Sequence, residues 1–164
     1  MRIISGNHKG RRIVAPKNLP VRPTADRAKE SLFNILENKY TLEEKKILDL
    51  FCGTGNISFE FSSRYKSEIT AVDINKKCIR FVEKINKELD LNIKTVLQDC
   101  FKFIKKNKNN YDVIFLDPPY DYDKYYEIKD LILENEIINK NGCLIIEHDK
   151  RINFDEKNTD VRKY

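Results

Sequence analysis

The segment Asp117-Pro118-Pro119-Tyr120 follows an apolar run, Tyr111 to Leu116, and combines residue types suited to binding an amine. Neither proline carries an N–H group, so the segment offers carbonyl oxygens and one carboxylate but few donors. Two such acceptors can grip the hydrogens of an exocyclic amine on a nucleobase and aim its nitrogen lone pair at an electrophile. Tyr120 would stack on the face of an extruded or single-stranded base. A rigid turn that caps a strand is the alternative for this segment taken alone.

A glycine turn, Gly53-Thr54-Gly55, comes directly after another apolar run, Ile47 to Phe51. Without a Cβ the backbone can turn tightly and lie against a ligand. A lone Gly-x-Gly is weak evidence, but Asp49 lies in the run before the turn and Asp73 follows Gly55 by 18 residues. An acidic residue at that position can accept hydrogen bonds from both hydroxyls of a ribose. The sequence therefore predicts a cofactor that carries a ribose.

Other features of the turn narrow the choice of cofactor. A dinucleotide-binding fingerprint has a third glycine where this chain has Ser58, and no P-loop lysine is present. S-adenosylmethionine fits, because its cationic sulfonium and ammonium groups favour carboxylates over lysines around them. Asp99 is placed to meet the adenine amino group. The predicted cofactor-binding residues are Asp49, Phe51, Cys52, Gly53, Thr54, Gly55, Asp73, Ile74, Asp99 and Cys100.

The elements that must position these residues alternate between strands and helices from Lys46 onward. Near-continuous apolar strands that alternate with helices are typical of a parallel sheet covered on both faces. Right-handed crossovers then predict a doubly wound, mostly parallel α/β sheet of the Rossmann-like kind, with a ligand crevice at the carboxyl ends of the strands. The expected strands are 47–51, 69–72, 93–97, 111–116 and 142–147, and the expected helices are 57–64, 75–89, 101–104 and 126–138.

The first thirty residues carry eight basic side chains and two acidic ones, in a chain whose net charge is +5. A confined basic segment on a near-neutral body favours a polyanion partner, above all nucleic acid. Residues 2–5 and 11–14 are predicted to form a β-hairpin with Lys9, Arg11 and Arg12 near its tip. Three prolines then keep the chain extended until Thr24 caps a helix. We therefore divide the chain into a basic hairpin and arm, residues 1–23, and a cofactor-binding domain, residues 24–164.

Length and composition exclude several classes of protein. A chain of 164 residues is one domain's worth, and a hydrophobic fraction of 40% excludes intrinsic disorder as a class. No run approaches the ~18 apolar residues of a membrane span, and the N-terminus lacks the apolar core of a signal peptide, so we expect a cytoplasmic protein with no membrane partner. Four scattered cysteines without a Cys-x-x-Cys pair predict neither a metal site nor disulfides. Nothing resembles a coiled coil, and we expect a monomer.

Taken together, these motifs resemble the bacterial methyltransferases that act on a guanine N2 of small-subunit ribosomal RNA, the RsmD type. The resemblance covers nearly the whole chain. The Arg-Pro-Thr-x-Asp-Arg block at residues 22–27 is more specific than the glycine turn, and its combination with Asp-Pro-Pro-Tyr points to this family. The segments that carry the resemblance are Arg2 to Gly6, Lys9 to Arg12, Arg22 to Asn34, Leu48 to Gly55 and Asp112 to Tyr120.

The resemblance implies a class I methyltransferase that transfers a methyl group from S-adenosylmethionine to the exocyclic N2 of one guanine, position 966 in the usual numbering, of 16S ribosomal RNA. The implied partner is that RNA within an assembled or partly assembled small ribosomal subunit. The catalytic residues would be Asp117, Pro118, Pro119 and Tyr120, and the residues that hold substrate RNA would be Lys9, Arg11, Arg12, Arg22, Thr24 and Arg27. For Arg22 and Arg27, an ion pair with Glu30 or Asp26 is the structural alternative.

Two matters stay open on the sequence alone. Members of the family close their sheet with an antiparallel pair of strands, whereas this chain stops at Asp160 to Tyr164, so we expect the final antiparallel edge strand to be missing. The other matter is the function. An adenine-N6 methyltransferase would use the same acceptor segment, and a non-catalytic ribosome-assembly RNA-binding protein would keep the same fold. A nicotinamide dehydrogenase is disfavoured by Ser58 and by the lack of a suitable histidine.

Overall fold

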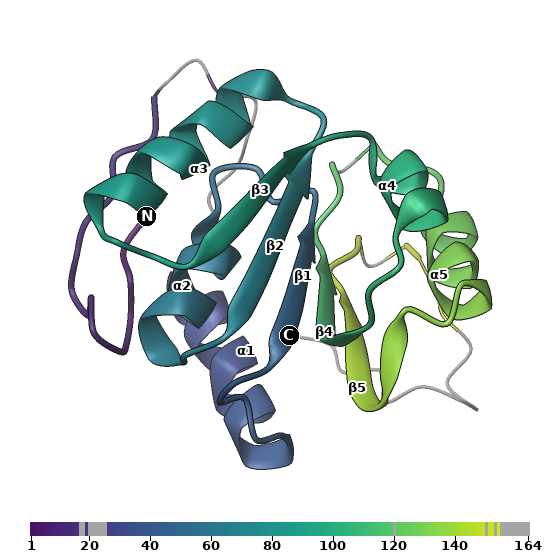
Figure 1. The fold of residues 1–164 in the computed structure, drawn as a ribbon, viewed down its shortest axis with the longest axis horizontal. Coiled ribbons are helices and arrows are strands. Elements are labelled where there is room, and N and C mark those ends of the chain that lie inside the picture. The colour runs from purple at the N-terminus through teal and green to yellow at the C-terminus, as the bar shows by residue number, and fades with distance from the viewer. Residues whose placement is uncertain (17–18, 20–25, 120, 150, 153, 155–164) are drawn as a thin grey trace.

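The protein is built on one five-stranded sheet in which every strand runs parallel to its neighbours (Figure 1). The structure, a computed structural model, describes residues 1–16, 19, 26–119, 121–149, 151–152 and 154. The strand order is β3-β2-β1-β4-β5, so the order reverses between β1 and β4, which is where open α/β sheets bind ligands. The strands are β1 (Lys46–Leu50), β2 (Glu68–Asp73), β3 (Ile93–Leu97), β4 (Tyr111–Leu116) and β5 (Ile138–Ile146).

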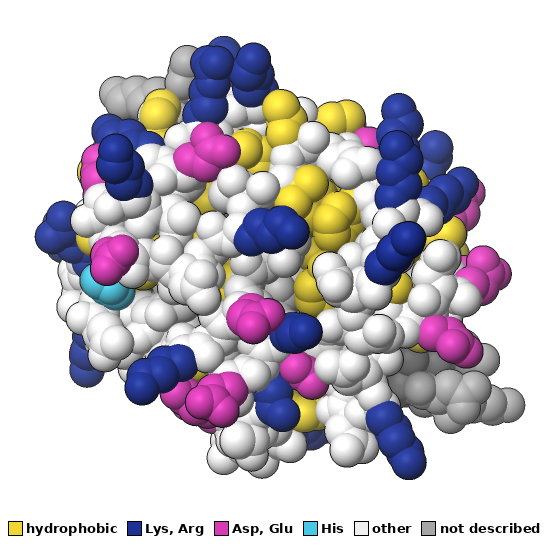
Figure 2. Space-filling view, viewed as in Figure 1, with side chains coloured by type: hydrophobic (Ala, Val, Ile, Leu, Met, Phe, Trp, Pro, Cys, Tyr) yellow, Lys and Arg dark blue, Asp and Glu magenta, His cyan; other side chains and the backbone are white. Residues whose placement is uncertain are grey.

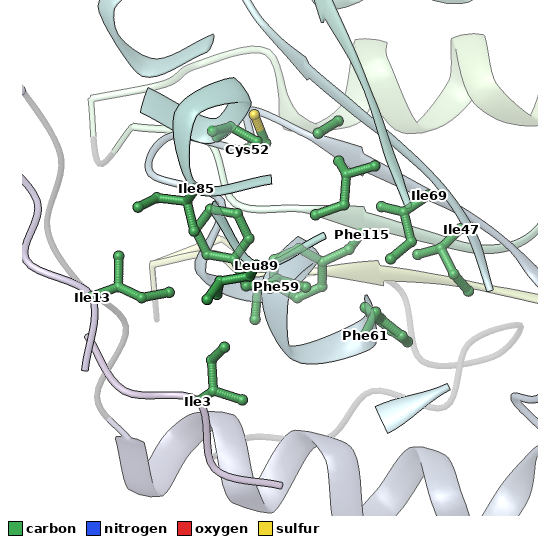
Figure 3. Packing of buried hydrophobic residues seen from close by; sticks show 14 of the residues in the cluster. Ile3, Ile13, Ile47, Cys52, Phe59, Phe61, Ile69, Ile85, Leu89 and Phe115 are labelled. Carbon is green, nitrogen blue, oxygen red and sulfur yellow. The ribbon is translucent and has the colours of Figure 1, made fainter. Parts of the chain in front are cut away.

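Helices cover both faces of the sheet, as a parallel sheet requires. The buried side chains form two clusters, one on each face. One face carries α1 (Asp26–Lys39), α2 (Asn56–Arg64) and α3 (Lys76–Glu88), and the other carries α4 (Cys100–Lys106) and α5 (Tyr125–Glu134). Figure 3 shows part of the cluster on the first of these faces, which includes Phe59, Phe61 and Phe115.

The N-terminal segment, residues 1–16, packs on the same face as α2 and α3. A single antiparallel bridge joins Arg2 to Arg12, so the predicted hairpin is present but its two arms are too short to count as strands. Ile3 and Ile13 are buried in the core cluster beside α3 (Figure 3). Gly6, with φ of 81°, lies so close to α2 that an added Cβ would overlap the backbone carbonyl of Ser63. The segment is therefore anchored at both ends of its turn and at the turn itself.

Two boundaries in the last third of the chain differ from the sequence prediction. The helix α5 ends at Glu134 rather than at residue 138, and β5 begins at Ile138 rather than at residue 142. Tyr111 pairs with Ile138 while Val113 pairs with Cys143, so β5 bulges over the residues between them. Apolar residues on both sides of the bulge made the region resemble a continued helix. Among the described residues, β5 is the edge strand on the β4 side of the sheet, and the predicted absence of a further strand concerns residues outside them.

The helices in the described ranges are all too short or too polar to cross a membrane.

Candidate active site at the carboxyl edge of the sheet

Four carboxylates meet where the strands end on one face of the sheet. Asp49 pairs in register with Ala71 and Phe115, and both of these pack into the cluster beneath α1, α2 and α3. Side chains two residues apart on a strand share a face, so Asp73 and Asp117 project to the same side as Asp49. The ladder continues one step past β4, because the N–H of Glu147 donates to the carbonyl oxygen of Leu116 at 2.8 Å. That step places Glu147 beside Asp117.

The glycine turn after β1 has a backbone that most residues cannot adopt. Phe51, Gly53 and Gly55 all have positive φ, at 61°, 51° and 76°. Phe51 therefore leaves the strand that the sequence assigned to it. The N–H of Cys52 donates to the carbonyl of Val72 at 3.0 Å, which ties the turn to the end of β2. Cys52 and Thr54 are buried, and α2 begins immediately after Gly55.

We expect replacement of Gly55 with alanine to destabilise the protein through two separable effects. The positive φ costs roughly 1–2 kcal/mol for any residue with a Cβ. The new Cβ would also lie 2.9 Å from Val82 Cγ2 on α3, and such overpacking costs about 1–3 kcal/mol more. Gly10→Ala is the matched control, because Gly10 has φ of 82° with nothing within 4 Å of a Cβ. Equal losses in the free energy of unfolding for the two variants, measured by denaturant titration, would contradict this packing.

Asp49 is buried beneath the turn and is held by α2. Its carboxylate accepts hydrogen bonds from Ser58 N at 3.2 Å and Ser58 Oγ at 2.5 Å. Burial raises the pKa of Asp49 to about 7, against the opposing effect of these two bonds, and the charge of Asp73 raises it further. Ser58 thus fixes the orientation of this acid. In the sequence it was noted only because it stands where a dinucleotide-binding fingerprint has its third glycine. A cation above the turn would favour the ionised carboxylate.

Asp73 lies at the end of β2 with its carboxylate partly exposed. It accepts hydrogen bonds from Gly53 N at 2.8 Å and from Asn75 N at 2.7 Å, one at each oxygen. Each carboxylate oxygen can accept more than one bond, so Asp73 keeps capacity for two ribose hydroxyls. The next residue, Ile74, leaves 69% of its surface exposed, which is unusual for isoleucine and suits a flat apolar ligand such as adenine.

Asp99 and Cys100 lie at the start of α4, on the other side of the turn. Asp99 Oδ1 accepts a bond from Lys102 N at 3.0 Å, so the acid caps the helix. The adenine contact expected for Asp99 stays a prediction. Burial raises the pKa of Cys100 to about 12, which keeps its thiol neutral. The hydroxyl of Tyr122 lies near them and, among the described residues, is the one fully buried side-chain oxygen or nitrogen that has no hydrogen-bond partner.

These residues fit S-adenosylmethionine. The Tyr122 ring packs edge-on against Phe51 with centroids 5.1 Å apart, and its unpaired hydroxyl lies near Asp99 and Cys100 at the start of α4. A buried hydroxyl normally has a partner, and a polar edge of a bound ligand would supply one. The Asp73 carboxylate would hold the ribose, and the carboxylate surroundings suit a cationic sulfonium. The sequence signal for Tyr122 was weak, because the chain holds eight tyrosines without a distinguishing pattern.

The segment after β4 brings acceptors to the same edge. Burial, followed by repulsion from Glu147 and from Asp49, raises the pKa of Asp117 to about 7. Pro118 is buried and Pro119 is exposed. The carbonyl of Pro119 already accepts a bond from Tyr122 N at 2.9 Å, which rigidifies the loop. Tyr120, the predicted stacking residue, lies outside the described residues.

The predicted RNA-binding residues divide into two groups. Lys9, Arg11, Arg12 and Arg27 are exposed, whereas Arg22 and Thr24 lie outside the described residues. Asp26, one of the two acids named as alternative ion-pair partners for Arg22 and Arg27, pairs with Arg2 at 3.1 Å. Lys29, which contributes to the basic count of the first thirty residues, is only 1% exposed and cannot reach a phosphate.

Lys29 instead belongs to a buried cluster, made of Lys29, Glu60, Arg64 and Asn56, that the sequence did not indicate. Its ammonium contacts Glu60 at 2.9 Å and donates to Asn56 Oδ1 at 2.8 Å. The carboxylate of Glu60 also accepts bonds from Arg64 Nε and from the backbone N–H groups of Ile4 and Ser5. Because Asn56 is the first residue of α2, the cluster joins the N-terminal segment to the helix that begins at the cofactor turn.

Comparison with solved structures identifies the class of this protein. A protein from Escherichia coli described as a putative methyltransferase superposes with a TM-score of 0.81 at 28% identity, over 90% of this chain and 80% of that one. The parallel sheet, the glycine turn and the acid after β2 thus define a class I methyltransferase, whose methyl donor is S-adenosylmethionine. The fold class and the cofactor predicted from the sequence are confirmed.

The family follows from sequence comparison. Residues 1–164 match the family described as Conserved hypothetical protein 95, and the chain belongs to it. It is 38% identical over 152 residues to "Ribosomal RNA small subunit methyltransferase D" of Buchnera aphidicola from Acyrthosiphon pisum, covering 91% of this chain and 78% of that protein. It is 32% identical over 161 residues to "Putative rRNA methyltransferase YlbH" of Bacillus subtilis, covering 95% and 86%. The resemblance seen in the sequence is confirmed.

Proposed function

We propose that this protein transfers a methyl group from S-adenosylmethionine to the exocyclic N2 of a guanine in 16S ribosomal RNA, the guanine-966 type. The observation that carries the proposal is the position of Asp117, which follows β4 at the same edge of the sheet as Asp49 and Asp73 and is succeeded by two prolines. The names of the relatives support a ribosomal RNA substrate. The partner would be the small ribosomal subunit, and the compartment the cytoplasm.

The chain's own residues would activate the amine rather than the methyl group. S-adenosylmethionine supplies a methyl on a sulfonium, which leaves as a neutral thioether when the carbon–sulfur bond breaks and the carbon–nitrogen bond forms. Asp117 and a proline carbonyl would accept the two N2 hydrogens and direct the nitrogen lone pair along the line of transfer. The positive charge that grows on nitrogen is stabilised by the carboxylate. With a pKa of about 7, Asp117 is suited to take the proton that the nitrogen then releases.

Glu147 favours guanine over adenine in this site. The Watson–Crick edge of guanine presents N1–H and N2–H as adjacent donors, whereas the N1 of adenine is an acceptor beside its amine. Glu147 follows β5 directly beside Asp117 and is exposed, so its ionised carboxylate is open to a ligand as an acceptor. Two neighbouring carboxylates could accept from both guanine donors at once, but one of them would face a lone pair on adenine. The pair of acids therefore complements guanine.

The identity of the methylated base tests the proposed function. Small subunits and free 16S ribosomal RNA, both from a strain that lacks this methylation, would be incubated with the protein and labelled S-adenosylmethionine. We expect the label in N2-methylguanosine after digestion to nucleosides, at a single position of the RNA. Label in N6-methyladenosine would overturn the assignment to guanine. If calorimetry showed that the protein binds the cofactor but neither RNA preparation became labelled, the RNA substrate itself would be contradicted.

A further inference from the structure

The helix α3 is strongly basic on the side that faces away from the sheet. It holds five basic residues against two acidic ones, although the chain beyond the first thirty residues is close to neutral. The inner side of the helix is buried, and its buried residues include Cys78, Phe81, Val82 and Ile85. The exposed basic residues are Lys76, Lys77, Arg80, Lys84 and Lys87.

Four of these side chains form a continuous stripe, which we call the α3 stripe: Lys76, Arg80, Lys84 and Lys87. The spacings of four, four and three residues keep them on one side of a helix, over a length of about 16 Å. Figure 2 shows Lys and Arg side chains gathered over the upper end of α3, the end nearest the carboxyl edge of the sheet in Figure 1.

The charges of the stripe are largely unneutralised. Lys84 reaches Glu88 at 3.6 Å, a loose and exposed pair that contributes little. Glu83, the other acid of the helix, accepts a bond from Thr95 Oγ1 on β3 at 3.1 Å. Within the described part of the chain, Lys76, Arg80 and Lys87 have no acidic partner. A solvated charged helix face more often alternates its signs.

The stripe continues into the predicted RNA-binding residues of the N-terminal segment. A shallow groove of about 160 Å³ separates that segment from the last two turns of α3. Arg11 and Arg12 line one side of it and Lys84 the other, with Val14, whose surface is 87% exposed, at its margin. At its other end the stripe begins at Lys76, three residues after Asp73 of the cofactor site. The basic surface thus leads from the N-terminal arginines to the edge where the reaction would occur.

We propose that the α3 stripe binds the phosphate backbone of ribosomal RNA beside the nucleotide that is methylated. This inference rests on the proposed function, which supplies the RNA substrate. The stripe and the pair Arg11 and Arg12 stand on opposite sides of one groove, where Lys84 lines the α3 side together with its acidic neighbour Glu88. Contacts of this kind position the RNA without reading its sequence. The predicted interface of residues 1–27 is then only part of the RNA-binding surface.

The test compares two variants that lose the same charge from opposite faces of the sheet. The first, Lys76→Gln with Arg80→Gln and Lys87→Gln, removes three charges of the stripe. The second, Lys102→Gln with Lys105→Gln and Lys106→Gln, removes three exposed charges from α4. Binding to 16S ribosomal RNA is measured by filter retention between 50 and 200 mM salt, about the range over which phosphate contacts weaken strongly. Thermal unfolding checks that both variants are folded.

We expect the stripe variant to bind roughly 10- to 100-fold more weakly, and the slope of log affinity against log salt to fall by about 2–3. The α4 variant should retain the wild-type slope. Equal losses in the two variants would reveal an effect of net charge alone and overturn the proposal, as would a wild-type slope in the stripe variant. Either of these two results would overturn the role of the stripe without contradicting the proposed function. Failure of the wild-type protein to methylate RNA would contradict the proposed function instead.

Discussion

Replacing Asp117 with alanine is expected to reduce methyl transfer by about 10³-fold or more while leaving S-adenosylmethionine binding nearly intact. Asp117 follows β4 at the edge of the site, and its carboxylate is the negatively charged acceptor of the Asp-Pro-Pro segment. Without it the amine keeps its lone pair delocalised into the base and the charge on nitrogen is unopposed. Asp73 and the glycine turn, which would hold the cofactor, make no hydrogen bond to Asp117 and remain in place. Single-turnover transfer of labelled methyl and calorimetric titration of the cofactor measure the two effects separately.

Asp117→Asn and Asp130→Asn are the matched variants for this experiment. The asparagine at position 117 keeps the shape and one acceptor oxygen, so any loss reports the missing charge and the missing proton acceptor. Asp130 is an exposed acid on α5, and its replacement should change nothing. If Asp117→Ala transferred methyl at the wild-type rate, the acceptor mechanism would be wrong even though the fold and cofactor site remained.

The same residue gives the expected pH dependence. The folded-state pKa of Asp117 is raised from its ordinary value to about 7, so the carboxyl is protonated below that pH and ionised above it. Only the ionised form accepts from the amine and takes up its proton, so transfer at limiting cofactor, which reports the cofactor-free protein, should rise as pH increases through about 7. Asp117→Asn should flatten that rise. A bound sulfonium would lower the pKa and move the rise to lower pH.

The sequence predicted the sheet well because its strands are nearly continuous apolar runs separated by helices. The doubly wound parallel arrangement follows from right-handed crossovers, and β3 and β4 have the predicted bounds. The bulge in β5 was not predictable, because the residues from Asn139 to Gly142 contain no signal that separates an irregular strand from a loop. Phe51 illustrates the same limit: an apolar residue at the end of a strand gives no indication of a positive φ.

The site itself was predicted as far as its residues are local in sequence. Asp49, the glycine turn, Asp73 and Asp117 each follow or end a strand, and parallel strands bring such residues to one edge. Ser58, Tyr122 and Glu147, which the structure adds to the candidate site, were not predicted, because their positions depend on contacts between elements. Lys29 was assigned to the basic N-terminal surface, since a lysine is almost always exposed unless a distant acid pairs with it. Its partner lies 31 residues further along the chain.

Replacing Glu60 with glutamine is expected to destabilise the protein by about 3–5 kcal/mol, because it leaves Lys29 buried without a compensating charge. Burial alone would raise the pKa of Glu60, but bonds from Ile4 N, Lys29 and Arg64 lower it, so the native carboxyl is ionised. The amide of glutamine would present its own N–H groups to some of these donors. A loss of this size lowers the thermal midpoint by roughly 10 °C in a chain of this length.

Glu88→Gln provides the control, since it is the same chemical change in the exposed pair with Lys84 and should cost less than about 0.5 kcal/mol. Hydrogen exchange then locates the effect. The amides of Ile4 and Ser5 donate to Glu60 at 2.9 and 3.0 Å, so they should lose protection in Glu60→Gln before amides of the β1 and β4 strands do. Faster exchange of these amides in Glu60→Gln would show that one buried carboxylate holds the N-terminal segment against α2. Equal thermal midpoints for Glu60→Gln and Glu88→Gln would mean that the cluster is not what holds the N-terminal segment in place.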